Sequence, residues 1–203
     1  MGIAGIILAA GESMRMGRDK ALLPWPPDAG TSASTLLGSA IKSLAEYCDL
    51  VIVVSGRNET SLQPVVWAHG AFLIRNPAPE LGQFSSLQTG LQEALNRGRD
   101  NALITLVDRP PPRTETLSLL VDNFQGREHR TWAVVPEFQG KHGHPILAGR
   151  DMIEKFLRAP STSSAREIEH LHQAHISYLA VGDPRVTMNL DTPEDYASIK
   201  SES

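Results

Sequence analysis

Small residues and positive side chains follow an apolar run near the start of the chain. Residues 3–8 are apolar, and the polar stretch behind them holds the candidate anion-binding groups Ala9, Ala10, Gly11, Ser13, Arg15, Gly17 and Lys20. Small residues after a strand let backbone N–H groups approach an anion closely, and Arg and Lys supply matching charge. The stretch therefore predicts a phosphate-binding loop at the carboxyl end of the first strand, where open α/β sheets bind ligands.

This loop is neither of the two commonest phosphate-binding motifs. Gly11 and Gly17 are too far apart for Gly-x-x-x-x-Gly-Lys-[Ser/Thr], and Lys20 is followed by Ala21. A dinucleotide-binding Gly-x-Gly-x-x-Gly triplet does not occur in the sequence. An ordinary polar loop between a strand and a helix remains the alternative.

Asp108 is the second candidate for chemistry, because it directly follows the apolar run 102–107. It should therefore project at the same sheet edge as the first loop. A carboxylate there would repel a polyphosphate unless a cation lay between them, which makes Asp108 a candidate Mg²⁺ ligand. The alternative is a turn or helix-capping aspartate ahead of Pro110.

Asp191 is the third candidate. It lies two positions after Asn189 in an extended segment, so both side chains should point the same way, and Asp191 could complete a metal site. The following Thr192, Pro193 and Asp195 are typical of a helix start. Both interpretations can hold, since Asp191 precedes that helix.

Composition limits the classes of protein. A chain of 203 residues with 41% hydrophobic and 21% charged residues is expected to form one globular domain over residues 1–203. The net charge of −4 implies no general attraction to nucleic acid or membranes. The single cysteine, Cys48, excludes an internal disulfide framework and favours a reducing, cytoplasmic location. The apolar run at the start is too short to cross a bilayer and has no cleavage pattern.

Apolar runs alternate with helical patterns along the chain, which predicts an α/β fold with a mainly parallel sheet and right-handed crossovers. The expected strands are 3–8, 50–54, 71–74, 102–107, 132–135, 143–147 (antiparallel) and 176–181. The first expected helix begins near residue 35, and the last one follows residue 192. Between them, helices are expected at 59–68, 87–97, 113–124, 151–157 and 165–172.

The first loop resembles the nucleotidyltransferase signature L-A-[AG]-G-x-S-x-R-[MF]-G-x-x-K. Every fixed position is met, by Leu8, Ala9, Ala10, Gly11, Ser13, Arg15, Met16, Gly17 and Lys20. Residues 82–91, Asp108-Arg109-Pro110, residues 143–145 and residues 189–195 follow in the order found in molybdenum cofactor nucleotidylyltransferases. The chain is similar to that family from about residue 3 to 196. Ala10-Gly11 matches the Ala-Gly form of the signature that is usual in the cytidylyltransferase branch.

The resemblance implies a Rossmann-like nucleotidyltransferase fold, a three-layer α/β/α sandwich. It implies Mg²⁺-dependent transfer of CMP from CTP to molybdopterin with release of pyrophosphate, and transient contact with a molybdoenzyme or its chaperone. Arg15, Lys20 and Asp108 would be catalytic. The implied nucleotide-binding residues are Leu8, Ala9, Ala10, Gly11, Ser13, Arg15, Lys20, Ser85 and Ser86. Asp108 and Asp191 would bind Mg²⁺, while His144 and Asn189 would face the pterin acceptor.

Two positions depart from the family pattern. Arg109 stands where the family usually has Gln between Asp and Pro, and residues 159–166 replace a Gly-Asp-x-Gly segment that helps to bind the acceptor. The alternatives are guanylyl or other nucleotidyl transfer to a different phosphorylated acceptor, such as a sugar phosphate, and a non-catalytic nucleotide-binding chaperone.

Overall fold

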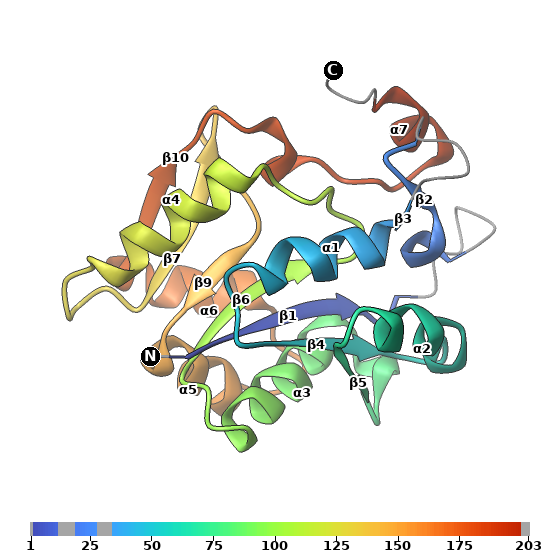
Figure 1. Ribbon diagram of the computed structural model, residues 1–203. Helices are drawn as coiled ribbons and strands as arrows, with labels where there is room; N and C mark the ends of the chain where they lie inside the picture. The colour runs from blue at the N-terminus through green and yellow to red at the C-terminus, as the bar shows by residue number, and fades with distance from the viewer. Residues whose placement is uncertain (1, 12–18, 28–33, 200–203) are drawn as a thin grey trace.

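A computed structural model describes residues 2–11, 19–27 and 34–199, which form a central sheet covered by helices on both faces (Figure 1). The eight-stranded sheet has the order β10-β7-β9-β6-β1-β4-β5, and β8 pairs with β7. Its strands are β1 Ile3–Ala9, β4 Leu50–Ser55, β5 Phe72–Arg75, β6 Asn101–Leu106, β7 Ala133–Phe138, β8 Lys141–His142, β9 Ile146–Ala148 and β10 Ile176–Ala180.

Parallel pairing dominates, as the sequence predicts. β1 lies between β4 and β6 with both neighbours parallel, so the carboxyl ends of these three strands meet at one edge. The stretch expected as one antiparallel strand, 143–147, forms a strand only from Ile146, and a short extra strand, β8, precedes it. β8 and β9 are both antiparallel to their neighbours, and the Gly143-His144-Pro145 turn connects them. Proline cannot donate to a strand ladder, which explains why the turn interrupts the pairing.

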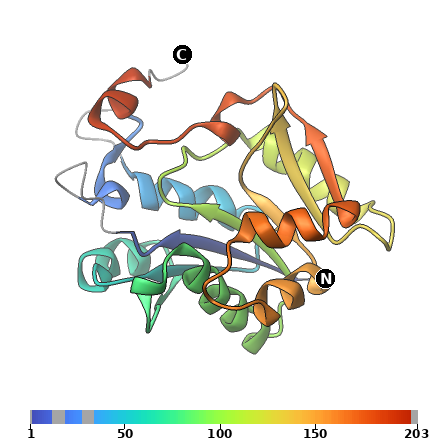
Figure 2. The same cartoon turned by 180° about the vertical axis from the view of Figure 1, so that it is seen from behind.

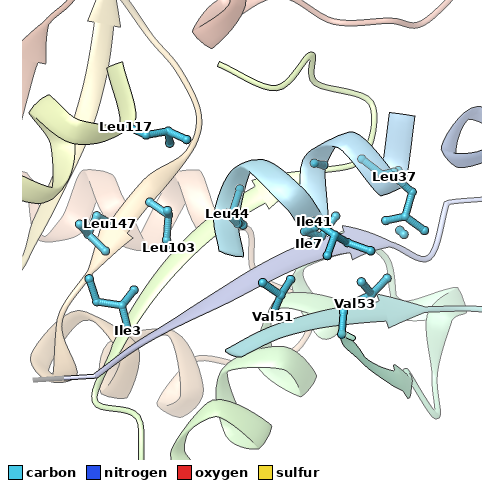
Figure 3. Close-up of a cluster of buried hydrophobic side chains, with 14 of the residues drawn as sticks. Ile3, Ile7, Leu37, Ile41, Leu44, Val51, Val53, Leu103, Leu117 and Leu147 are labelled. Carbon is cyan, nitrogen blue, oxygen red and sulfur yellow. The ribbon is translucent and has the colours of Figure 1, made fainter. Parts of the chain in front are cut away.

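The strands alternate buried side chains between two hydrophobic cores. Ile3, Ile7 and Val53 belong to the core on the face covered by α1 Leu36–Ala45, α2 Glu59–Ala68 and α4 Thr114–Gln125. Figure 3 shows Ile7 beside Ile41 of α1, and Ile3 near Leu103 and Leu147. The opposite face packs on α3 Gln83–Asn96, α5 Arg150–Arg158 and α6 Ala165–Leu171, seen from behind in Figure 2. This two-sided burial explains the continuous apolar runs in the sequence.

Helix α3 begins four residues earlier than the apolar spacing predicts, at Gln83 rather than residue 87. Gly82 caps it with φ of 94°, a conformation that favours glycine, and Phe84 joins the core beneath the sheet. The expected loop residues Ser85 and Ser86 therefore belong to the first turn of a helix.

The end of the chain returns to its beginning. Leu190 packs with Trp25 and Leu36 in a small third core, and α7 Pro193–Ser198 starts with a capping box between Thr192 and Asp195, as the sequence predicts. The N-terminal excursion contributes a 3-10 helix, Lys20–Leu22, and a two-stranded sheet of β2 Pro24–Trp25 and β3 Ser34–Thr35. Among the helices described, none has both the length and the apolar character needed to span a membrane.

Candidate active site

A cavity of about 510 Å³ opens at the carboxyl edge of β1, β4 and β6, which we call the first cavity. Leu8 of β1 and Ala10 and Gly11, which directly follow β1, border it on one side, and Asp108 borders it from the turn after β6. Lys20 and the first-turn residue Ser86 of α3 complete its polar lining, together with residues of the turn before α3. The parallel strands thus bring the first loop and Asp108 to the same edge of the sheet.

Lys20 contacts both of the predicted carboxylates, Asp108 and Asp191. Its side chain is largely buried, and its Nζ atom donates to Oδ1 of Asp191 at 2.9 Å and lies 4.0 Å from Oδ2 of Asp108. The Lys20–Asp191 contact joins residues 171 positions apart in the chain. The three side chains predicted from separate parts of the sequence therefore form one cluster. Ser13 and Arg15, also predicted here, lie outside the described residues.

Asp108 has the properties of a group that needs a cation. Burial raises the pKa of its carboxyl, while the nearby charges of Lys20 and Arg109 act in the opposite direction. Its Oδ1 atom is buried and accepts no hydrogen bond from any described residue. Asp191 brings a second carboxylate to the cluster, and its charge also acts on Asp108.

These two carboxylates fit a divalent metal ion that shares its ligands with a substrate. Within the described ranges, no group of three or more His, Cys, Asp or Glu side chains is arranged to hold a metal. Mg²⁺ commonly takes one or two carboxylates from the protein and the rest of its ligands from water and substrate phosphates. The orphaned oxygen of Asp108 is the donor that such an ion would use.

A side chain absent from the sequence predictions holds Lys20 in position. The amide nitrogen of Asn58 donates to the carbonyl oxygen of Ala9 at 2.9 Å and to Oδ2 of Asp19 at 2.7 Å. Asp19 in turn caps the 3-10 helix by accepting from the backbone N–H of Ala21 at 3.0 Å. Asn58 therefore ties the end of β1 to the helix that carries Lys20.

One signal in the sequence could have indicated this part of the edge. Gly56, Arg57 and Asn58 directly follow the second apolar run, and Asn at such a position commonly fixes a turn: Oδ1 of Asn58 accepts from the N–H of Gly56 at 3.1 Å. Arg57 borders the first cavity and adds a cation to it.

The predicted nucleotide-binding residues divide into lining and supporting groups. Leu8, Ala10, Gly11 and Ser86 border the first cavity. Ala9 is buried beneath it and presents its carbonyl to Asn58. The buried hydroxyl of Ser85 donates to the carbonyl of Gly82 at 2.7 Å and accepts from Asn76 at 2.8 Å, so it stabilises the turn before α3 instead of lining the cavity.

A second cavity of about 860 Å³ adjoins the first and shares Leu8, Gln83 and Leu106 with it. Its ionisable side chains come from the turn after β6, from β8 and the turn behind it, and from α6; they are Arg109, Lys141, His142, His144, Arg166 and Glu169. Cations outnumber carboxylates in this set. The second cavity is therefore suited to an anionic molecule placed beside whatever occupies the first.

His144 borders the second cavity, but Asn189 does not. Burial, with the charge of Arg109, lowers the pKa of His144 to about 4, so its imidazole is neutral at neutral pH. Asn189 is exposed and borders a separate hollow of about 290 Å³ beside Pro110. The reason is Leu190: its side chain is buried against Trp25, which turns Asn189 outward.

Both departures from the family pattern lie in the second cavity. Arg109 borders it, and its guanidinium donates to the carbonyl of Met188 at 3.0 Å. Burial lowers the pKa of Arg109, and its buried Nε–H donates to no described residue. Of residues 159–166, the last four border the same cavity, and Ser164 caps α6 through a capping box with Glu167.

Comparison with known proteins identifies the family of this chain. Residues 5–176 match the model of the MobA-like NTP transferase domain. The chain is 26% identical over 202 residues to a protein named molybdenum cofactor cytidylyltransferase from Escherichia coli (strain K12), covering 96% of this chain and 94% of that one. It is 30% identical over 200 residues to a probable molybdenum cofactor guanylyltransferase from Mycobacterium avium (strain 104), covering 98% and 95%.

The fold is similar to that of solved structures. The crystal structure of Rv0371c from Mycobacterium tuberculosis H37Rv superposes with a TM-score of 0.80 at 25% identity, covering 97% of this chain and 96% of that one. Rv0371c has also been solved in complex with manganese, and that structure superposes with a TM-score of 0.70 at 22% identity and 97% coverage of both chains. The chain belongs to the MobA-like NTP transferase family and is a nucleotidyltransferase.

Proposed function

We propose that this protein transfers CMP from CTP to molybdopterin and releases pyrophosphate. The observation that carries the proposal is the Lys20–Asp108–Asp191 cluster beside two adjoining cavities, one of which is bordered by the first loop. The names of the relatives support the acceptor, since both refer to the molybdenum cofactor. The cluster supports phosphoryl chemistry because it joins a buried cation to two carboxylates.

The reaction needs little from the protein beyond position and charge. The acceptor is a phosphomonoester that is already ionised at neutral pH, so no general base is required. One of its oxygens attacks the α-phosphorus of CTP in line, the bond from that phosphorus to the bridging oxygen breaks, and pyrophosphate leaves with the electron pair. Such transfers depend on alignment and on stabilising negative charge.

The chain's own residues divide this work. Lys20 would exchange Asp191 for the triphosphate, and Arg15 would add a second cation. Asp108 and Asp191 would hold Mg²⁺, which when bound supplies charge neutralisation at the phosphates. Ser86, Ala10 and the backbone of the first loop would contact the nucleoside, while neutral His144 would border the acceptor. Asn189 lies outside the second cavity, so it would contact the acceptor only after a movement of its segment.

Guanylyl transfer is the second candidate, because the relative at 30% identity carries the guanylyl name. Ala10 favours cytidylyl transfer: it borders the first cavity, where the family's guanylyl branch usually has glycine, and its methyl group would leave less space for a base. A pyrimidine needs less space than a purine.

The test is pyrophosphate release by the purified protein with molybdopterin, run separately with CTP, GTP and ATP, with Mg²⁺ and with a chelator. Release with CTP alone that the chelator abolishes is the expected result. Release with GTP alone would replace the nucleotide and keep the reaction. Tight CTP binding without release, also when a sugar phosphate replaces molybdopterin, would contradict transfer and favour a non-catalytic nucleotide-binding role.

A further inference from the structure

Glu169 is a carboxylate that the proposed chemistry does not use. It lies in α6 and borders the second cavity, where it is the acidic member of a mainly cationic lining. Its side chain makes no hydrogen bond to the described residues, and no cation among them lies within the 4.0 Å of an ion pair. Arg166, one turn earlier in α6, is the cation whose charge acts on it from a greater distance.

The half-buried carboxyl of Glu169 lies where its charged form is disfavoured. Burial raises the pKa of Glu169 to about 7, well above the value of 4.5 for a free side chain. Removing a charged group from water without hydrogen bonds destabilises a protein, and native structures usually pair such groups. A ligand that donates hydrogen bonds would supply the missing partners.

The charged residues at the two ends of the second cavity interact with different groups. The charges that act on Arg109 are those of Asp108 and Asp191, so this end of the cavity adjoins the proposed reaction centre. Glu169 instead acts on Tyr178, whose ring stacks on His142 at 3.9 Å between centroids. Glu169 therefore marks the end that lies away from the reacting phosphate.

An acceptor that reacts through a phosphate must place that phosphate near Lys20 and Arg109, and its remaining body must extend toward α6. From this we infer that Glu169 is a specificity-determining residue that receives the paired N–H donors of a 2-amino-4-oxopyrimidine ring, the edge that a pterin acceptor carries. A carboxylate has two oxygens that match two adjacent N–H groups, and such charge-assisted pairs are strong. This inference rests on the proposed function for the direction in which the acceptor lies.

Binding of a stable probe tests the inference without relying on turnover. The probe is 6-hydroxymethylpterin phosphate, and the comparison ligand is the corresponding lumazine phosphate, in which an oxo group replaces the 2-amino group. We expect the wild-type protein to bind the pterin about tenfold or more tightly than the lumazine, since the lumazine cannot donate the matching pair of hydrogen bonds. Loss of this preference is expected in Glu169→Gln, and partial retention in Glu169→Asp, which keeps the carboxylate.

The controls separate recognition from folding and from catalysis. Glu46→Gln makes the same chemical change at an exposed position at the end of α1 and should leave pterin binding unchanged. CTP binding should be unaltered in Glu169→Gln, because Glu169 borders only the second cavity. Equal pterin binding by wild type and a folded Glu169→Gln variant, or no preference for pterin over lumazine in the wild type, would overturn the inference.

Failure of the inference and failure of the proposed function give different results. Wild-type protein that releases pyrophosphate with molybdopterin but binds pterin and lumazine probes equally would keep the function and overturn the role of Glu169. A Glu169-dependent pterin preference without any pyrophosphate release would keep the role of Glu169 and overturn the transfer reaction.

Discussion

Lys20 lies between the two carboxylates of the site: its Nζ atom donates a hydrogen bond to Asp191 and lies 4.0 Å from Oδ2 of Asp108. Both carboxylates also interact with the charge of Arg109, so two cations and two carboxylates meet here. Under the proposed function a triphosphate would add further negative charge, and a divalent metal ion held by the carboxylates would offset it when the nucleotide replaces Asp191 as the partner of Lys20. The free protein thus holds Lys20 in place before substrate arrives.

Replacing Lys20 should remove transition-state stabilisation without unfolding the chain. Lys20→Met is expected to lower the turnover number about 100-fold or more, the usual cost of losing one charge partner at the reacting phosphate. Pyrophosphate release under saturating substrates measures this effect. Lys42→Met, on the exposed side of α1, is the matched control and should keep wild-type turnover. Equal rates in the two variants would exclude Lys20 from catalysis.

The raised pKa of Glu169 gives a stability effect whose direction is fixed. Between pH 4.5 and about 7 the folded protein binds more protons at Glu169 than the unfolded chain does, so this residue lowers the free energy of unfolding as pH rises through that range. Glu169→Gln removes this loss and should be the more stable protein at pH 8, by at most about 3 kcal/mol. Urea unfolding of both proteins at several pH values measures the difference, and a difference that does not vary with pH would contradict the shift.

At the scale of elements, the close packing of α3 on the sheet determines where the first turn of α3 meets the first cavity. Gly90 makes this possible, because a Cβ atom there would lie 2.8 Å from Cγ2 of Ile6 and 3.0 Å from Cγ2 of Val54. Both neighbours are fully buried in the core, so neither can move away easily. The absence of a side chain at Gly90 therefore holds Ser86 and Gln83 against the strand ends.

Gly90→Ala should consequently destabilise the protein although alanine favours helices. Overpacking typically costs about 1–3 kcal/mol, more than the helix propensity gained by removing a glycine, about 1 kcal/mol. The midpoint of urea unfolding should fall. Gly126→Ala, where the nearest atom to the new Cβ is 3.5 Å away, should change the midpoint little. A Gly90→Ala midpoint at or above the wild-type value would show that α3 can shift.

The elements were largely predictable because buried strands read as continuous apolar runs, and the matching helices repeat apolar residues on one face. The start of α3 was not predictable, since the hydroxyl of Ser85 and the φ of Gly82 satisfy the helix end through tertiary contacts. In the site, Lys20, Asp108 and Asp191 could be placed together because each follows a strand or precedes a helix at one sheet edge. The position of Asn58 after an apolar run indicates a turn, but its contacts with Ala9 and Asp19 depend on the fold and could not be predicted. The position of Glu169 beside the second cavity could not be predicted either, because it depends on how α6 packs.

At the scale of the whole molecule, the chain closes on itself at the site. The backbone N–H of Leu190 donates to the carbonyl of Asp108 at 2.9 Å, and the next residue, Asp191, binds Lys20. In Figure 1 the C-terminal segment and α7 lie beside β2 and β3 of the N-terminal excursion. The third core, formed by Leu190, Trp25 and Leu36, packs the C-terminal segment against the segment that follows β1. Stability of this small core should therefore matter more to turnover than its size suggests.

Two leucine variants separate that local effect from general destabilisation. Leu190 and Leu120 are almost completely buried, the first in the third core and the second on α4 within the large core away from the cluster. Replacing either by alanine should lower the free energy of unfolding by about 2–5 kcal/mol. Only Leu190→Ala should also lower the turnover number of the folded enzyme, about tenfold or more, because it releases Asp191 from its position beside Lys20, and misplacement by about 1 Å at a reacting centre is enough for such losses. Turnover measured well below both melting temperatures makes the comparison. Wild-type turnover in folded Leu190→Ala would mean that Lys20 holds Asp191 without help from the third core, whereas equal losses in both variants would trace the effect to global stability.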